Sequence, residues 1–169
     1  MIRVMLVDDQ AIVREGLSSM LSVEQDISVV CQAASGAEAL RLVPIFRPDV
    51  VLMDVRMPDM DGLTTLERLK GRHPDLCVIM VTLYDDPDYL YRAVSAGAAG
   101  YILKDASREE LVNAVRTIAA GGAIISPGML RDLLARIGGL VDASTRERTH
   151  GPDVGLTARE VEVLKLLAE

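Results

Sequence analysis

The sequence is poor in aromatic residues and has no excess of basic ones. It contains no tryptophan, one phenylalanine and four tyrosines in 169 residues. It therefore lacks the aromatic platform on which single-stranded nucleic acids stack. The net charge is −7, and we find no basic stripe of the kind that holds a phosphate backbone. Residues 1–169 by themselves are not expected to bind nucleic acid strongly.

Long apolar runs and cysteine clusters are also missing. Every apolar stretch is well short of the roughly 18 residues that cross a bilayer, and the first residues, MIRVMLV, lack the sections of a signal peptide. The two cysteines, Cys31 and Cys77, form no CxxC or Cys/His pattern, which favours buried free thiols over a zinc site. We expect a cytoplasmic protein without membrane contact.

What the sequence does contain is a strict alternation of short apolar runs and amphipathic segments. Strands are predicted at 2–7, 28–33, 49–53, 77–81 and 100–103, and helices at 10–22, 35–45, 62–72, 86–97 and 107–120. Such alternation is typical of a parallel sheet covered by helices on both faces. The predicted fold class is α/β, a flavodoxin-like, doubly wound, five-stranded parallel sheet in the order 2-1-3-4-5.

Two of the predicted helices carry clear end signals. Ser107 is a plausible N-cap for the fifth helix. The apolar face of that helix is formed at helical spacing by Leu111, Ala114, Val115 and Ile118. In the second helix, Pro44 is expected to end the helix early, because proline removes a backbone donor and clashes one turn back.

The character of the chain changes after about residue 121. Residues 1–122 form the predicted first domain, and 123–155 a helical and flexible linker in which Ser126-Pro127 opens a short helix to about Ile137. The last segment, 156–169, begins with the sequence pattern of a capping box, and its apolar spacing predicts one amphipathic helix. A single such helix has no core of its own, so this segment is expected to be the incomplete start of a second domain.

Five polar residues each follow or close an apolar run, and these are the candidate functional residues: Asp8, Asp9, Asp54, Thr82 and Lys104. Each alone has an ordinary explanation as a helix cap, a turn residue or a solvated charge. Together they are placed at the carboxyl ends of parallel strands, where open α/β sheets bind their ligands. We therefore expect them to meet at one edge of the sheet.

Three carboxylates that meet in this way predict a cation site. Each would raise the pKa of the others unless a positive charge is present, and Mg²⁺ prefers oxygen ligands in a site that phosphate often completes. Asp54 is the expected nucleophile, since a carboxylate can attack phosphorus to give an aspartyl phosphate. Lys104 would compensate charge on the phosphoryl oxygens, and Thr82 would donate a hydrogen bond to one of them.

Four stretches carry a resemblance to a known family. LVDD, LMDVRMPDMDG, VTLYDD and AGAAGYILKDA, in that order, resemble the receiver domain of two-component signalling over residues 2 to about 120. The final LTAREVEVLKLLAE resembles the opening helix of a LuxR-type helix-turn-helix. The whole arrangement is similar to a response regulator of the NarL/FixJ family that is cut off early in its output domain.

The resemblance implies a role for each site residue. Asp54 would accept a phosphoryl group from a sensor histidine kinase. Asp9, Asp54 and the backbone carbonyl of Arg56 would bind Mg²⁺, with Asp8 acting through water. The phosphoryl oxygens would be held by Thr82, Lys104 and the backbone amides of Arg56 and Leu83.

The resemblance also implies a conformational switch. Tyr101 would turn inward as Thr82 moves toward the phosphate; from position alone, a half-buried tyrosine with its hydroxyl in water is the alternative. Arg56 and Tyr84 would flank the phosphoryl group and could hinder hydrolysis. Many receivers have a proline, joined by a cis bond, after the motif lysine. Here Asp105 follows, which leaves the isomer of that bond open.

The leading functional prediction is a phosphorylation-controlled transcription regulator that is not an enzyme beyond its own phosphotransfer and dephosphorylation. Phosphorylation would promote a homodimer, and promoter DNA would be bound by the full-length protein only. One alternative is a stand-alone receiver that acts by protein contact or phosphorelay. Another is a phosphatase of the haloacid-dehalogenase type, but the DxD pattern of that class is absent at Asp54-Val55-Arg56.

Overall fold

The computed structural model describes residues 1–83, 86–125, 128–131 and 133–135. The chain divides into two units, Met1–Ser126 and Pro127–Glu169. Of the second unit, residues 128–131 and 133–135 are helical, within the stretch where a short helix was predicted. The predicted flexible stretch 141–155 and the final segment 156–169 lie outside the described residues.

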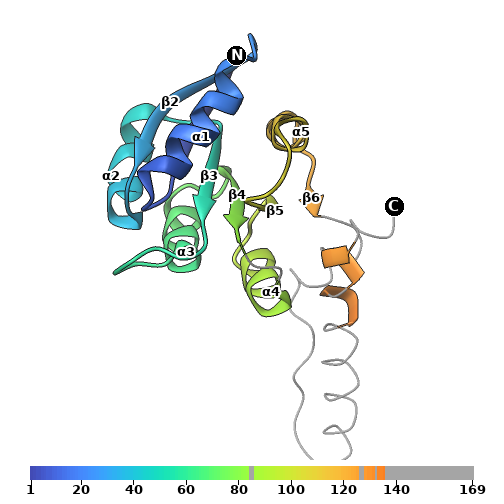
Figure 1. The fold of residues 1–169 in the computed structure, drawn as a ribbon. Helices are drawn as coiled ribbons and strands as arrows, with labels where there is room; N and C mark the ends of the chain where they lie inside the picture. The colour runs from blue at the N-terminus through green and yellow to red at the C-terminus, as the bar shows by residue number, and fades with distance from the viewer. Residues whose placement is uncertain (84–85, 126–127, 132, 136–169) are drawn as a thin grey trace, which may run out of the picture. The chain divides into compact units, whose positions relative to one another are not determined.

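The first unit is a parallel sheet with connecting helices (Figure 1). Its strands are β1 Ile2–Val7, β2 Ile27–Ala33, β3 Val50–Asp54, β4 Cys77–Thr82, β5 Gly100–Leu103 and β6 Ile124–Ile125. Its helices are α1 Ala11–Ser22, α2 Gly36–Phe46, α3 Gly62–Arg72, α4 Pro87–Ser95 and α5 Arg108–Ala119. The predicted elements are confirmed to within two residues at each end.

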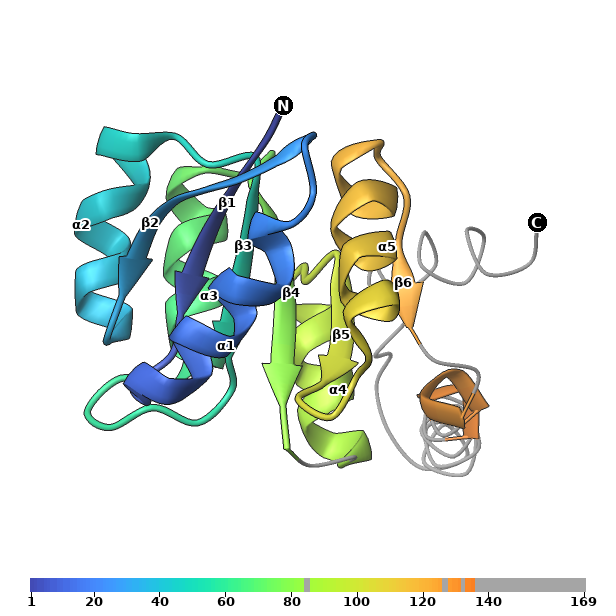
Figure 2. The same ribbon diagram turned by 45° about the horizontal axis from the view of Figure 1, so that its top comes forward.

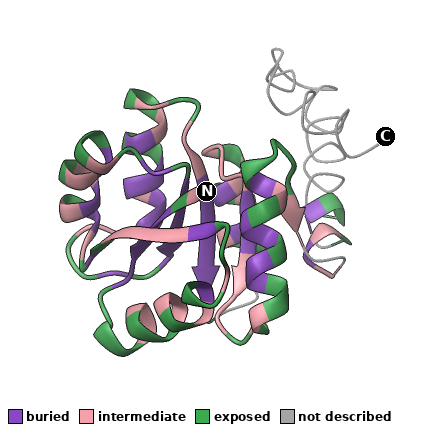
Figure 3. Cartoon of the chain, turned by 90° about the horizontal axis from the view of Figure 1, so that it is seen from above, coloured by how far each residue is buried: buried purple, intermediate pink, exposed green. Residues whose placement is uncertain are grey.

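The helices cover both faces of the sheet. Helices α1 and α5 lie on one face and α2, α3 and α4 on the other (Figure 2). Alternate residues of a strand pack against the helices on opposite faces of the sheet, because successive side chains of a strand point to opposite faces. Val4 and Leu6 pack with the buried residues of α5, while the strand centres form the most buried layer of the unit (Figure 3).

The five-strand prediction was wrong by one strand. The sheet has the order β2-β1-β3-β4-β5-β6, so the predicted order holds for the first five strands. Strand β6 pairs Ile124 with Gly100 and Ile125 with Tyr101. Two residues are too few to show a strand periodicity in sequence. The preceding Gly121-Gly122 indicates the end of the alternating elements, so no further strand was predicted after it.

The expectation for Pro44 was also wrong. Proline lies inside α2, which continues to Phe46. Pro44 is exposed and falls in the last turn of the helix, where its missing N–H removes only one hydrogen bond and little helix remains beyond it. The helix instead ends at Arg47, whose backbone is left-handed with φ 44°.

Helix α5 matches its prediction in detail. Ser107 caps it and Glu110 completes a capping box, so two orphan backbone donors find side-chain acceptors. The four apolar residues that were predicted to face the core, Leu111, Ala114, Val115 and Ile118, are all buried. In the part of the chain that the structure describes, no helix is long and apolar enough to cross a membrane.

The left-handed residue at the end of α2 gives a stability prediction. We expect Arg47→Gly to raise the free energy of unfolding by about 0.5–1 kcal/mol, because a side chain destabilises the left-handed conformation that glycine adopts freely. Urea denaturation measures the change. Arg47→Ala is the control, since it removes the guanidinium but keeps the β-carbon; a gain in this variant equal to that of Arg47→Gly would contradict the backbone explanation.

Candidate phosphoacceptor site

The structure brings the five predicted polar residues together at the carboxyl edge of the sheet. Asp8 follows β1, Asp54 ends β3 and Thr82 ends β4. Lys104 follows β5, and its backbone N–H donates to the Thr82 carbonyl at 2.7 Å. The parallel register, with Thr82 opposite Leu103, thus sets Lys104 beside the end of β4.

Lys104 lies between two of the carboxylates. Its ammonium Nζ is 2.6 Å from Asp8 Oδ2 and 2.9 Å from Asp54 Oδ2. All three side chains are at least 93% buried, so these ion pairs are shielded from solvent. Removing one partner of such a pair leaves a buried charge without compensation, which is strongly destabilising.

The acidic residues form a cluster that fits a divalent cation. Asp8, Asp9 and Asp54 each offer a carboxylate oxygen, and these oxygens lie within 4.8 Å of one another. Asp9 is exposed, whereas Asp8 and Asp54 are buried. Three carboxylates against one ammonium leave an excess of two negative charges. A hard cation with oxygen ligands, such as Mg²⁺, matches both the donor set and the missing charge.

Burial and charge shift the pKa values of the two central groups. Burial raises the pKa of Asp54 above its usual value, and the hydrogen bond and positive charge of Lys104 offset this only in part. For Lys104, burial alone would lower the pKa, but hydrogen bonds to Asp8 and Asp54 reverse the effect and raise it. Lys104 is therefore a permanent cation at neutral pH.

Asp8 is anchored more firmly than the sequence indicated. Its Oδ1 accepts the backbone N–H of Gln10 at 2.8 Å, and its carbonyl accepts a hydrogen bond from Arg14 Nη1 at 2.6 Å. Sequence reasoning missed Arg14, because an arginine six residues away on an amphipathic helix looks like an ordinary half-exposed charge. The bond ties α1 to the loop that carries both Asp8 and Asp9.

The remaining predicted residues have the following environments. The backbone N–H of Arg56 donates to the Asp54 carboxylate. Leu83 is 64% exposed directly after β4, and Tyr84 lies outside the described residues. Tyr101 is 1% exposed, so its ring is inside the unit and the half-buried alternative does not describe it.

A second residue that sequence reasoning missed is Tyr89 on α4. The guanidinium carbon of Arg56 lies 5.3 Å from the centroid of the Tyr89 ring. This separation is within the range of a cation–π contact. The only signal in the sequence was an aromatic residue near the start of a helix, which does not identify a partner in the loop after β3.

The peptide bond that the sequence left open is trans. No cis bond occurs in the described residues, which include Lys104 and Asp105. Lys104 nevertheless reaches both Asp8 and Asp54. The departure from the commoner lysine-proline pattern therefore leaves the ammonium in the position that the site needs.

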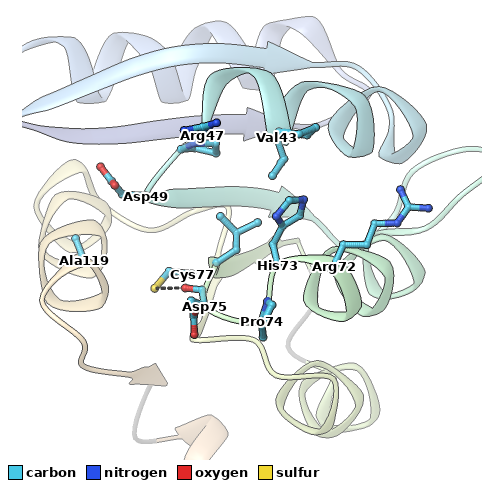
Figure 4. Close-up of a pocket in the computed structure, with 12 residues that line it drawn as sticks. Val43, Arg47, Asp49, Arg72, His73, Pro74, Asp75, Cys77 and Ala119 are labelled. Atoms are coloured by element: carbon cyan, nitrogen blue, oxygen red, sulfur yellow. Dashed lines mark hydrogen bonds between the residues drawn. The ribbon is translucent and has the colours of Figure 1, made fainter.

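A separate groove lies at the opposite edge of the sheet (Figure 4). It is formed where β3 and β4 begin and α5 ends, with Asp49, Cys77 and Ala119 in its lining. The Cys77 sulfur lies 4.0 Å from the Asp75 carbonyl, a weak contact. None of the predicted site residues borders this groove, so the candidate site is confined to the carboxyl edge.

Comparison with known proteins gives consistent matches. Residues 4–116 match the response regulator receiver domain. The chain is 37% identical over 169 residues to the DNA-binding transcriptional activator DevR/DosR of Mycobacterium tuberculosis, covering 100% of this chain and 75% of that protein. It is also 37% identical over 168 residues to the oxygen regulatory protein NreC of Staphylococcus carnosus, covering 99% and 77%. The chain thus spans about three quarters of the length of these relatives.

Solved structures show the same similarity. The receiver domain of the putative response regulator NarL from Mycobacterium tuberculosis superposes with a TM-score of 0.68 at 39% identity, covering 71% of this chain and 97% of that one. A LuxR-family two-component response regulator from Aurantimonas gives 0.75 at 32% identity, covering 79% and 96%. The predicted resemblance is confirmed: the chain belongs to the NarL/LuxR-type response regulators of two-component signalling and carries their receiver domain.

Proposed function

We propose that Asp54 accepts a phosphoryl group from a sensor histidine kinase with Mg²⁺, and that this modification controls dimerisation and DNA binding of the full-length protein. Membership of the family implies phosphorylation-controlled regulation of transcription. The single observation that supports the proposed chemistry is the buried Asp54 carboxylate, held by Lys104 within a cluster of acids.

The transfer step follows from this arrangement. An oxygen of the ionised Asp54 carboxylate attacks phosphorus and forms a new P–O bond. The P–N bond to the kinase histidine breaks, and its electron pair stays on the imidazole nitrogen. Asp54 needs no general base because the attacking form carries no proton. Lys104, the hydroxyl of Thr82 and the backbone amides of Arg56 and Leu83 would bind the phosphoryl oxygens.

Mg²⁺ would be held by Asp9, Asp54 and the Arg56 carbonyl. Receiver domains bind Mg²⁺ at an acidic pocket, and the Asp8, Asp9 and Asp54 cluster is such a pocket. The exposed position of Asp9 supports a direct role for it, while the firm anchoring of Asp8 supports a role through water. When bound, the cation supplies positive charge for the phosphoryl oxygens.

The response to phosphorylation would pass through Thr82 and Tyr101. Thr82 is 2% exposed and Tyr101 1% exposed, on neighbouring strands. A hydroxyl that moves toward the phosphoryl group changes the space that the tyrosine ring can occupy. The surface of α4, β5 and α5, or that of α1 and α5, would then form the homodimer, which would place two output domains on paired DNA half-sites.

The test of this proposal uses Asp54→Asn. With Mg²⁺ and acetyl phosphate, the wild type should gain the mass of one phosphoryl group, and Asp54→Asn should gain none, because the amide oxygen is a far weaker nucleophile. With Mg²⁺ and beryllofluoride, a stand-in for the phosphoryl group, sedimentation should show a change of oligomeric state in the wild type only.

The matched control is Asp59→Asn, which removes an exposed acid from the loop that follows Asp54. Asparagine tolerates the positive φ of 65° at this position. This variant should be phosphorylated like the wild type. A phosphoryl gain in Asp54→Asn, or an equal gain without any divalent cation, would refute the assignment.

A further inference from the structure

We infer that Tyr89 is a positioning residue for Arg56 and that it thereby slows hydrolysis of the aspartyl phosphate at Asp54. The inference rests on the proposed function, because it concerns the lifetime of the phosphorylated state. It assigns to α4 a direct contact with the loop that follows the phosphoacceptor.

The contact joins an exposed cation to a half-buried ring. Arg56 is exposed and Tyr89 is of intermediate burial, with 5.3 Å between the guanidinium carbon and the ring centroid. A guanidinium at this distance is attracted to the negative face of the ring. A free arginine side chain samples many rotamers, so the ring restricts where the Arg56 side chain can lie.

The ring itself is on a firmly held helix. Asp86 caps α4 by accepting the backbone N–H of Asp88 at 2.9 Å, and Pro87 occupies the first turn. On the inner side of the helix, Leu90 is 1% exposed and Ala93 is fully buried. Tyr89 therefore offers Arg56 a fixed partner.

Arg56 connects this helix to the phosphoacceptor through its own backbone. Its N–H donates to the Asp54 carboxylate, while its side chain contacts α4. Strands β3 and β4 are neighbours in the sheet. The contact therefore links the loop after β3 to the helix after β4, and these two neighbouring strands end at Asp54 and Thr82.

This position bears on hydrolysis. Loss of the phosphoryl group requires water to attack phosphorus on the side opposite the Asp54 oxygen. The P–O bond to Asp54 then breaks and its electron pair returns to the carboxylate. Inorganic phosphate leaves as dihydrogen phosphate, with the oxygen and both protons of the water. Arg56 follows the phosphoacceptor by two residues, and its guanidinium, kept beside Tyr89, would obstruct the approach of that water. In the absence of the ring the guanidinium would sample more rotamers, and water would reach phosphorus more often.

The experiment measures the lifetime of the phosphorylated protein. Wild type and variants are phosphorylated with acetyl phosphate and Mg²⁺, the donor is removed, and loss of the phosphoryl mass is followed with time. Tyr89→Leu should lose it about two- to fivefold faster, the factor that corresponds to a cation–π contact at an exposed site. Tyr89→Phe keeps the ring and should behave like the wild type.

Two comparisons separate this role from general damage to α4. Tyr91→Leu makes the same change two positions along the helix, on a different face, and should leave the lifetime unchanged. In an Arg56→Ala background, Tyr89→Leu should have no further effect. Equal lifetimes of wild type and Tyr89→Leu, a matching effect in Tyr91→Leu, or an undiminished effect without Arg56 would each overturn the inference.

The same data distinguish failure of the inference from failure of the proposed function. If the wild type gains no phosphoryl group at Asp54, the proposed function fails and the inference falls with it. If the wild type is phosphorylated and the lifetimes do not differ, only the role of Tyr89 is refuted.

Discussion

Lys104→Met should lower the free energy of unfolding by about 3 kcal/mol near pH 7 when no divalent cation is present. Methionine keeps the length of the side chain and removes its charge. Asp8 and Asp54, both buried, then lose the ammonium that lies 2.6 and 2.9 Å from their oxygens. Urea denaturation in the presence of a chelator measures the loss.

The pH dependence of this loss has a definite sign. In the wild type, the pKa of Lys104 is raised in the folded state, so its stabilising contribution is fully present below its unfolded pKa and disappears only in strong alkali. In Lys104→Met, burial of Asp54 is no longer offset by the ammonium, so the pKa of Asp54 should rise further and its ionised form should destabilise the fold. Stability should therefore recover as the pH falls through the pKa of Asp54, and the difference in stability from the wild type should narrow in acid.

Three controls test the electrostatic explanation. Lys104→Arg retains the charge and should lose much less stability. Mg²⁺, which would supply the missing charge, should stabilise Lys104→Met more than it stabilises the wild type. Adding Asp54→Asn to Lys104→Met removes one of the opposed carboxylates and should restore part of the loss. A Lys104→Met protein as stable as the wild type in chelator would contradict the ion-pair account.

Among glycine-to-alanine substitutions in α3, Gly62→Ala should lower the free energy of unfolding the most. A β-carbon at Gly62 would lie 1.9 Å from the carbonyl oxygen of Asp54 and 3.0 Å from the methyl of Met80. The clash can be relieved only if α3 and the backbone of β3 move apart. We expect a loss of about 3 kcal/mol or more, measured by thermal and urea denaturation.

The matched control lies on the same helix. Gly71 has no atom within 4 Å of the position that a β-carbon would take. Gly71→Ala should leave stability unchanged or raise it by up to about 1 kcal/mol, because alanine favours helix more than glycine does. Equal stabilities of Gly62→Ala and Gly71→Ala would show that α3 can move away from β3, against the close approach in the structure.

The fold was predicted well where local periodicity decides it. Five strands and five helices followed from alternating apolar runs, and Ser107 was identified as a cap because its neighbours repeat at helical spacing. Strand β6 was not predicted, because two isoleucines are too short a stretch to show the alternating pattern of a strand. The close approach of Gly62 to the Asp54 carbonyl follows from the packing of α3 on β3, and no local sequence pattern contains that information.

The site was predictable to the extent that strand ends converge. Parallel topology alone indicated that Asp8, Asp54, Thr82 and Lys104 would meet, and they do. The contacts of Arg14 and Tyr89 were not predictable, because each depends on how a helix is placed against a loop distant from it in sequence. Their roles in the chemistry, like those of the metal and phosphoryl ligands, remain predictions for the experiments above.

The two borders of the sheet limit how copies of the protein can associate. One border is β6, which is only two residues long, and the other is β2, whose pairing with β1 shifts register between Val4 and Met5. Short edge strands and bulged edge strands both offer a poor template for a strand from another molecule. These edges disfavour pairing of strands between molecules, so two copies are expected to associate through side-chain surfaces such as α4, β5 and α5, or α1 and α5.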